Sequence, residues 1–400
     1  MSDITFRILF FLSLTFSLLF SSCGKDSHEP SDVSDNVDYS KIKRTVFVYA
    51  VNHSSLSYDF NDDLKEMREA FASTDENLFQ LLLFKTDSKE KCGLYRMEKD
   101  KSGTVTLALV KSYVRDKTST SPNRIAEVVN DALGLFPNSV YDMIFWGHAT
   151  SWLPDFSDHQ ITPDGMQKSY GGEYNGAVSS SGYRYTDWVN INELADCLPD
   201  KRIQTIWFDC CYMSGIEVIY EFRNKCDFFV AYPTEVWAEG MPYDKVLPKL
   251  LKTDPDLIGA ARTFFDFYDN RGSQATVAVV DMKGLENLAT VSHDIISSAV
   301  SLPDKKGLLN YSRISKRPLF DFRQFIHSVA TCNGADEKIA DFDKAFYETI
   351  IYSANTANDF NNRPWTLSVP SGVSTHYFTD NNTSDNNFYK TLDWYNRIYK

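Results

Sequence analysis

Residues 141–148 have the sequence YDMIFWGH, an apolar run that ends in a glycine and a histidine. A run of this length is typical of a buried strand, and Gly147 marks the point where the strand gives way to a loop. A second run, IQTIWFD at residues 203–209, has the same character and is followed by Cys210 and Cys211. The two runs therefore predict buried strands that each end in residues able to do chemistry.

Similar apolar runs lie on both sides of these two and alternate with stretches of helical spacing. This alternation is the pattern of a mostly parallel sheet flanked by helices, so we predict an α/β fold. The expected strands are residues 44–51, 77–84, 92–98 paired as a hairpin with 104–111, 141–148, 203–209, 228–232, 276–281 and 373–378. The expected helices are residues 62–71, 123–135, 191–198, one that begins at 320, and 346–357.

The chain is predicted to contain four parts. Residues 1–23 form a leader, and residues 24–40 are a polar, flexible tether. Residues 41–300 form the core, and residues 301–400, where the pattern changes, form an α/β subdomain packed on it. Within the core, residues 149–188 are rich in Gly, Ser and Tyr, which predicts a long loop with a functional role.

The leader predicts export. Arg7 precedes an apolar run over residues 8–20, which is too short to span a bilayer and fits the hydrophobic region of a signal peptide. The following FSSC at residues 20–23 resembles a bacterial lipoprotein box, in which Cys23 carries the lipid. The alternative is an ordinary cleaved signal with a chance cysteine. We therefore expect an extracytoplasmic protein, anchored by lipid to the bacterial cell envelope at the outer membrane or cell surface.

Composition limits the partners. Asp and Glu number 54 against 41 Lys and Arg, a formal net charge of −13, and no basic stripe is present. Nucleic-acid binding is therefore disfavoured, whereas an acidic surface attracts basic peptides. The cysteines after Cys23 have no regular spacing and no matching histidines, so neither a disulfide framework nor a zinc site is predicted.

His148 and Cys211 each follow a predicted strand, one helical crossover apart. The carboxyl ends of parallel strands form the edge where ligands bind in α/β sheets. A thiolate is a strong nucleophile, and an imidazole can take its proton and later give it to the leaving amine. The backbone N–H groups of Ala149 and Cys211 are candidates for stabilising an oxyanion. The pair predicts nucleophilic catalysis, with a purely structural His and Cys as the alternative.

Two segments resemble those of clostripain-like cysteine peptidases. FWGHATSW at residues 145–152 is similar to their Trp-x-His-Gly-x-Gly-Trp segment, and FDCCYMSGIE at 208–217 is similar to their Asp-Ala-Cys-Leu-Met-x-x-x-Glu segment. Further similarity lies in residues 46–67, 185–194, 231–243 and 373–378. The resemblance covers most of residues 44–400 and implies a caspase-like fold.

The resemblance makes Cys211 the nucleophile and His148 the general base and acid. Asp209 matches the acid at the floor of the family's S1 pocket, where a carboxylate pairs with a P1 Arg or Lys, the substrate residue before the cleaved bond. The alternative for Asp209 is a cap on the following helix. Cys210 stands where the family has Ala, so a small buried residue is expected there.

Two residues near His148 depart from the family's pattern. Ala149 stands where the family has Gly, and a positive φ there would strain the alanine; Ser151 also stands in place of a Gly. Family members also mature by cutting a loop between the two catalytic strands, which makes Lys168 and Arg184 candidate cleavage points. Some depend on calcium, but the acidic pair Asp62–Asp63 and the turn at 380–382 are expected to be solvated, and no metal ligand is predicted.

These observations predict an endopeptidase that cleaves after Arg or Lys through an acyl-enzyme. Its partners would be peptides or proteins with a basic P1 residue, and the membrane through its lipid. Two alternatives stay open. One is a weakly active or inactive peptidase homologue that acts as a binding lipoprotein, and the other is a sortase-like transpeptidase that uses the same dyad.

Overall fold

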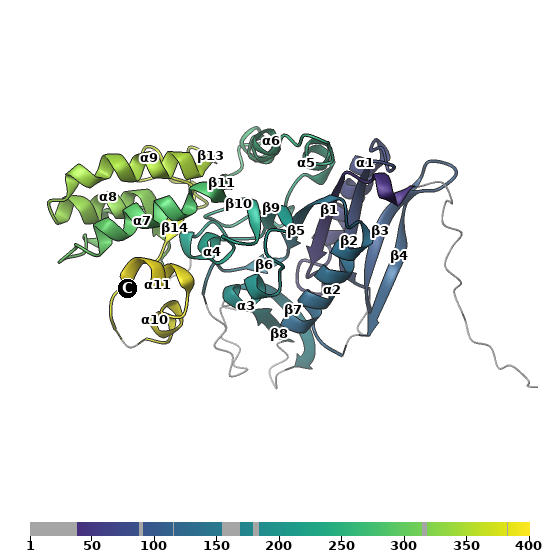
Figure 1. Ribbon diagram of the computed structural model, residues 1–400, viewed down its shortest axis with the longest axis horizontal. Coiled ribbons are helices and arrows are strands. Elements are labelled where there is room, and N and C mark those ends of the chain that lie inside the picture. Colours follow the sequence, from purple (N-terminus) through teal and green to yellow (C-terminus); the bar gives the residue numbers. More distant parts are fainter. Residues whose placement is uncertain are drawn as a thin grey trace, which may run out of the picture. The chain divides into compact units, whose positions relative to one another are not determined.

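A nine-stranded sheet organises the protein in the computed structural model (Figure 1). Its strand order is β13-β11-β10-β9-β5-β1-β2-β3-β4. The strands are β1 (Arg44–Ala50), β2 (Phe79–Thr86), β3 (Lys91–Lys99), β4 (Val105–Val114), β5 (Val140–Trp146), β9 (Ile203–Asp209), β10 (Cys226–Ala231), β11 (Thr276–Asp281) and β13 (Ile350–Asn355). The central strands β2, β1, β5, β9 and β10 are parallel, whereas the pairs at both edges are antiparallel.

The structure describes residues 38–87, 91–114, 116–153, 169–178, 184–313, 318–381 and 383–400. The predicted leader with Cys23, most of the tether and the candidate cleavage point Lys168 lie outside these ranges. Arg184 begins a strand within them. In the described part of the chain, no helix combines the length and apolarity needed to cross a membrane.

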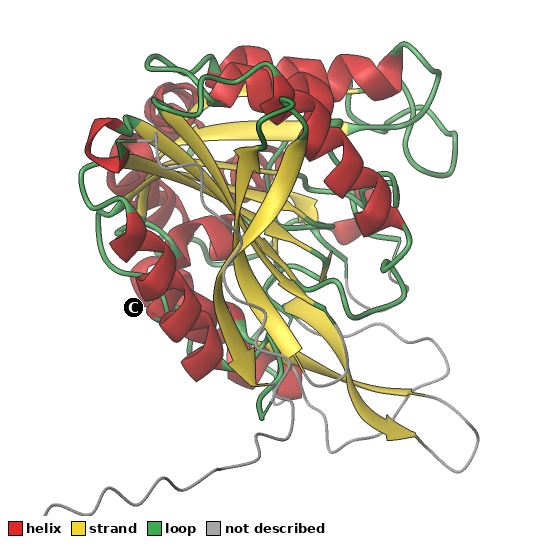
Figure 2. Cartoon of the chain, turned by 90° about the vertical axis from the view of Figure 1, so that its right-hand side faces the viewer, coloured by secondary structure: helices red, strands yellow, loops and turns green. Residues whose placement is uncertain are grey.

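Helices cover both faces of the sheet (Figure 2). On one face, α1 (Asp59–Ala72), α5 (Tyr243–Leu250) and α6 (Leu257–Asp269) pack on side chains such as Val46 and Trp207. The other face, which carries Phe47 and Phe208, is covered by α2 (Pro122–Leu135), α3 (Ile191–Asp196), α4 (Ile216–Glu221), α7 (Leu285–Ile296), α8 (Phe322–Cys332), α9 (Ile339–Thr349), α10 (Ser384–Tyr389) and α11 (Asp393–Tyr399). Burial on both faces explains why the central strands are almost uniformly apolar.

Local sequence determines where several of these elements begin. Pro122 opens α2, where its missing N–H costs nothing, and apolar side chains then recur at helical spacing along the buried face. Asn190 and Glu193 form a capping box at the start of α3. The α/β class, the mostly parallel sheet and the hairpin of β3 and β4 are as predicted, and β9 and β11 have the predicted bounds.

The prediction of one helix over residues 346–357 is wrong. Helix α9 ends at Thr349, and the chain continues as β13, which pairs with β11 in the main sheet. Pairing with a distant strand outweighs the local helical pattern. The predicted loop at 149–188 also contains strands: β6 (His148–Ala149), β7 (Tyr170–Val178) and β8 (Arg184–Val189) form a separate antiparallel sheet. Strands β12 (Phe320–Asp321) and β14 (Ser374–Thr375) form a third.

A buried ion pair joins β1 to β5. The Arg44 guanidinium lies 2.6 Å from Asp142 Oδ2 and also donates to the Lys252 carbonyl at 2.9 Å. Asp142→Ala is expected to lower the free energy of unfolding by about 3–5 kcal/mol, because it leaves a buried cation unpaired. Urea unfolding followed by circular dichroism measures this loss. The double variant Arg44→Met, Asp142→Leu should lose less, and a larger loss there would contradict the explanation.

Candidate active site

The carboxyl ends of β5 and β9 bring His148 and Cys211 together. The two strands are neighbours, with Trp146 opposite Asp209 at their last paired position. Beyond Trp146 the chain turns at Gly147, whose φ is +144°. A Cβ there would make only ordinary contact with Val51 Cβ, at 3.4 Å, so the conformation and not a lack of space favours glycine. The turn directs the chain into β6, which begins at His148.

His148, Asp209 and Cys211 line one cavity of about 140 Å³. The remaining lining residues come from the ends of β5 and β9, the loop after β1 and the segment between β10 and α5: Leu56, Trp146, Gly147, Cys210, Val236, Trp237, Ala238 and Gly240. The structure therefore places the predicted dyad and the predicted S1 acid around the same space. The lining is mostly apolar with a few convergent polar groups, as in small-ligand sites.

The His148 ring is oriented by a residue that the sequence did not reveal. Its Nε2 lies 2.8 Å from the hydroxyl of Ser55, in the loop after β1. Burial lowers the pKa of the imidazole, so its neutral form is favoured. With Ser55 Oγ accepting from Nε2–H, Nδ1 carries the lone pair and is the nitrogen able to take a proton. Ser55 is exposed in a polar loop, where nothing in the pattern distinguishes it.

The Cys211 thiol contacts the wall of the cavity. The Val236 N–H donates to Cys211 Sγ at 3.3 Å, and the thiol in turn faces the Val236 carbonyl at 3.9 Å. Burial raises the pKa of the thiol to about 11. Among the described residues, no hydrogen bond joins His148 to Cys211. The thiol is thus held by the Val236 backbone, in surroundings that favour its protonated form.

Asp209 lies at the base of the cavity, with 5% of its surface exposed. Its Oδ2 accepts from the Met241 N–H at 3.1 Å and from the Tyr243 hydroxyl at 3.0 Å, whereas Oδ1 has no partner. Burial raises the pKa of this carboxyl to about 6. Helix α4 has Gly215 at its N-cap and no side-chain cap, so the alternative role of Asp209 as a helix cap is wrong.

A second carboxylate lies behind the same wall. Asp63, on α1, is 2% exposed, and its Oδ2 accepts from Trp146 Nε1 at 2.6 Å. Burial and the neighbouring Asp209 raise its pKa to about 9. The expectation of a solvated acidic pair is therefore wrong for Asp63, although Asp62 is exposed.

The residues flanking the dyad differ in backbone strain. Ser151 and Tyr212 have φ values of +63° and +64°, whereas Ala149 is not in a positive-φ conformation. The Ala in place of Gly is thus unstrained, and the Ser in place of Gly is the strained one. Cys210 is buried in the core, as predicted, and its thiol donates to the Phe145 carbonyl at 3.2 Å.

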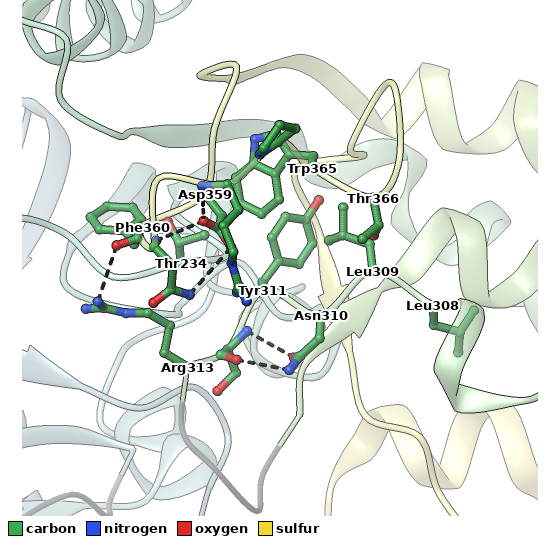
Figure 3. Close-up of a pocket in the computed structure, with 14 residues that line it drawn as sticks. Thr234, Leu308, Leu309, Asn310, Tyr311, Arg313, Asp359, Phe360, Trp365 and Thr366 are labelled. Carbon is green, nitrogen blue, oxygen red and sulfur yellow. Dashed lines mark hydrogen bonds and ion pairs between the residues drawn. The ribbon is translucent and has the colours of Figure 1, made fainter.

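A second cavity, of about 320 Å³, is lined by residues of other segments (Figure 3). Tyr311 and Trp365 line it, and its lining contains neither Cys nor His. Phe360, at its rim, packs against Trp237 of the first cavity with ring centroids 5.4 Å apart. Arg313 donates to the Phe360 carbonyl and to Glu235. The charged side chains of its lining are all in ion pairs, Arg313 with Glu235 and Asp359 with Arg363, so the lining offers no free charged group.

The described residues offer no metal site. No three His, Cys, Asp or Glu side chains in this part of the chain come together in a way that could hold an ion. Asp380, in one of the acidic turns, pairs with Lys390 at 2.7 Å. The donor set therefore does not fit the calcium that the resemblance suggests, and no step of the chemistry is assigned to a metal.

Comparison with known proteins identifies similar folds. No curated protein matches the chain. A secreted C11 cysteine protease from Bacteroides thetaiotaomicron, solved with an irreversible peptide inhibitor, superposes with a TM-score of 0.73 at 24% identity, over 89% of this chain and 99% of that one. An inactive zymogen C11 protease from Parabacteroides distasonis gives 0.72 at 23%, over 90% and 99%. These likenesses show a shared fold.

The family is shown by a model that spans nearly the whole described chain. The model for the clostripain family matches residues 46–399. This range contains His148, Asp209 and Cys211, and the three residues lie around one cavity. The chain therefore belongs to the clostripain family of cysteine peptidases.

Proposed function

We propose that this protein is a cysteine endopeptidase that cleaves peptides after Arg or Lys outside the cytoplasm. The observation that carries the proposal is the single cavity lined by His148, Cys211 and Asp209. A nucleophile, a base and an acidic side chain for a basic P1 residue meet there without any other titratable group in the lining except Cys210. Family membership supports peptide hydrolysis, and the unpartnered Asp209 oxygen supports the basic P1 residue.

In the proposed reaction, the Cys211 thiol leaves the Val236 N–H and gives its proton to His148 Nδ1. The sulfur attacks the scissile carbonyl carbon, and the resulting oxyanion is stabilised by backbone N–H groups. The Cys211 N–H is free for this role, because no described residue accepts from it. The imidazolium then protonates the leaving amine, and water, deprotonated by the same ring, releases the acyl group and restores the thiol.

Ser55 is expected to act as a positioning residue for His148. Ser55→Ala should lower kcat about tenfold with little change in KM, because the ring loses the 2.8 Å contact that orients it. The pH profile of kcat/KM should also shift, since the loss of a hydrogen-bond partner changes the balance between the charged and neutral ring. Ser55→Thr should rescue both, and Ser57→Ala, in the same loop, is the control. Unchanged kcat and pH profile in Ser55→Ala would reject the role.

Processing of the chain is part of the proposal. Cleavage near Lys168 or Arg184, between the two catalytic strands, would free the hairpin that begins with β6 and His148. The existence of a related protease described as a zymogen supports this step. Intact mature protein with full activity would contradict it. The lipid anchor at Cys23 and a location on the bacterial cell envelope are likewise proposed, and mass spectrometry of the mature N-terminus tests both.

The test is hydrolysis of a fluorogenic peptide panel that varies only at P1, by protein beginning at residue 24. Turnover confined to Arg and Lys supports the proposal. Turnover at other residues would keep the dyad and discard the S1 role of Asp209. Absence of turnover, even after nicking of the 149–188 segment, would favour the inactive binding lipoprotein, for which the resting contact of Cys211 with Val236 already provides a reason. Added amine that captures the acyl group would reveal a transpeptidase.

A further inference from the structure

Two carboxylates face each other across one glycine at the base of the cavity. A Cβ placed on Gly240 would lie 3.1 Å from Asp209 Oδ2 and 3.5 Å from Asp63 Oδ2. Gly240 also has a φ of +62°, so a side chain there is disfavoured by conformation and by the tight approach of Asp209 Oδ2. The carboxylates come from different elements, Asp63 from α1 and Asp209 from the end of β9. The fold therefore brings them together across the backbone of Gly240.

Neither carboxylate has a cationic partner in the described part of the chain. Asp63 accepts from Trp146, and Asp209 accepts from Met241 and Tyr243, all of them neutral donors. Asp209 Oδ1 is buried and has no partner at all. Burying two acids without a cation is unfavourable unless one holds a proton or a ligand brings a positive charge. The pair therefore needs a proton in the free protein, and a cationic ligand can take the place of that proton.

We propose that Asp63 and Asp209 together form the base of the P1 pocket and that the pair selects arginine over lysine. This inference rests on the proposed peptidase function and assigns Asp63 a role in specificity. Asp209 lines the cavity and meets the incoming cation directly. Asp63 contacts Trp146 and approaches Gly240, which are both part of the lining, so its charge acts from directly behind the wall.

Arginine fits this pair better than lysine. A guanidinium presents five N–H donors in a planar fork and spreads its charge over three nitrogens. It can therefore donate to acceptors on two sides of a site. An ammonium is a compact, strongly hydrated charge that gains less from a second carboxylate behind the wall. The unpartnered Asp209 oxygen supplies the first acceptor, and the Asp63 charge favours the delocalised cation.

Binding should also release a proton. The charged or titratable groups that face Asp63 are Asp59 and Glu66 on α1, Asp209 at the end of β9, Tyr243 on α5 and Tyr268 on α6. None is cationic, and burial together with Asp209 raises the Asp63 pKa to about 9. Asp63 therefore holds a proton at neutral pH in the free protein. A cation in the pocket lowers that pKa again, and the proton leaves.

The experiment uses the full chain carrying Cys211→Ala, which separates binding from catalysis. Three blocked peptide amides that differ only in the last residue, arginine, lysine or citrulline, are titrated by calorimetry in two buffers of different ionisation enthalpy. The arginine peptide should bind tightest and release about one proton near pH 7.5, and citrulline, neutral but similar in shape, should bind weakest. Adding Asp63→Asn should weaken arginine binding about tenfold, lysine binding less, and abolish the proton release.

Asp62→Asn is the matched control, since it removes an exposed acid from the preceding position of the same helix. Asp63→Asn keeps a carbonyl oxygen for Trp146 Nε1, and its melting temperature checks the fold. Should it fail to fold, the pH dependence of arginine binding decides, because affinity must rise between about pH 6 and about pH 9 if a proton leaves. The proposed role of the Asp63–Asp209 pair is overturned if the affinity for the arginine peptide does not change with pH. It is also overturned if Asp63→Asn leaves both arginine affinity and proton release unchanged.

The outcomes also separate this inference from the peptidase proposal. If wild-type protein cleaves after basic residues but Asp63→Asn keeps the same arginine preference, only the role of Asp63 is rejected. If none of the three peptides binds, both the P1 pocket and the pair are rejected. If the arginine peptide binds as expected but no peptide is ever cleaved, the pair stands as a binding site and the catalytic proposal fails.

Discussion

Replacing Cys211 with alanine is expected to lower kcat/KM for peptides with a basic P1 residue by a factor on the order of 10⁴ or more. The thiol is the only group in the cavity lining able to form the acyl-enzyme, apart from Cys210, which points into the core. Binding should survive, because the P1 carboxylate and the cavity walls are unchanged. Steady-state hydrolysis, with an active-site titration by a thiol-reactive basic peptide, measures both.

The neighbouring cysteine provides the control. Cys210→Ala removes an identical thiol one position away, but that thiol donates to the Phe145 carbonyl on the far side of the strand. We expect near wild-type turnover and a modest loss of stability from the small buried volume removed. If activity survives in Cys211→Ala and disappears in Cys210→Ala, the nucleophile is Cys210 and the assignment to Cys211 is wrong.

Asp209→Asn should be the second most damaging change for basic substrates. It keeps acceptors for the Met241 N–H and the Tyr243 hydroxyl but removes the charge, so kcat/KM for P1 Arg or Lys should fall by roughly 10²- to 10³-fold. A citrulline substrate should be almost unaffected. In the wild type, KM for basic substrates should rise as pH falls through about 6, where the buried carboxyl takes up a proton, and the variant should lose this limb.

Glu239→Gln is the matched comparison. Glu239 lies in the same segment, but it is exposed and paired with Arg271 at 3.5 Å. Its replacement should change kcat/KM by less than about twofold, because exposed ion pairs contribute little. Equal losses in both variants would mean that general negative charge, and not the buried Asp209, attracts the basic residue.

Much of the fold could be predicted because its strands are local signals. β5 and β9 are apolar on both faces, and each is followed by residues with recognisable chemistry, so the pairing of His148 with Cys211 at one sheet edge followed from general rules. β13 could not be found this way. Its place beside β11 depends on a partner about 75 residues away, whereas the chain around it reads locally as a continuation of α9.

Asp63 and Ser55, the two site residues that the sequence analysis missed, differ in whether the sequence contains a signal for them. Asp63 falls three positions after Phe60 and four before Met67, on the buried face of α1, and an acid at such a position is a signal of a functional or paired group. Ser55 gives no such signal. It lies in a polar loop, and only the three-dimensional return of β6 toward the end of β1 brings it to His148.

The contact between Cys211 and the Val236 N–H has a consequence for the oxidation of this thiol. Peroxides and disulfides react with the thiolate, and a thiol whose pKa is raised to about 11 supplies almost none at neutral pH. If Cys211 is the nucleophile, as proposed, its thiol resists oxidation until a peptide displaces the Val236 backbone from it. The proposed mechanism then predicts that the resting protein is stable to oxidants and that only the substrate-bound protein exposes a reactive thiolate.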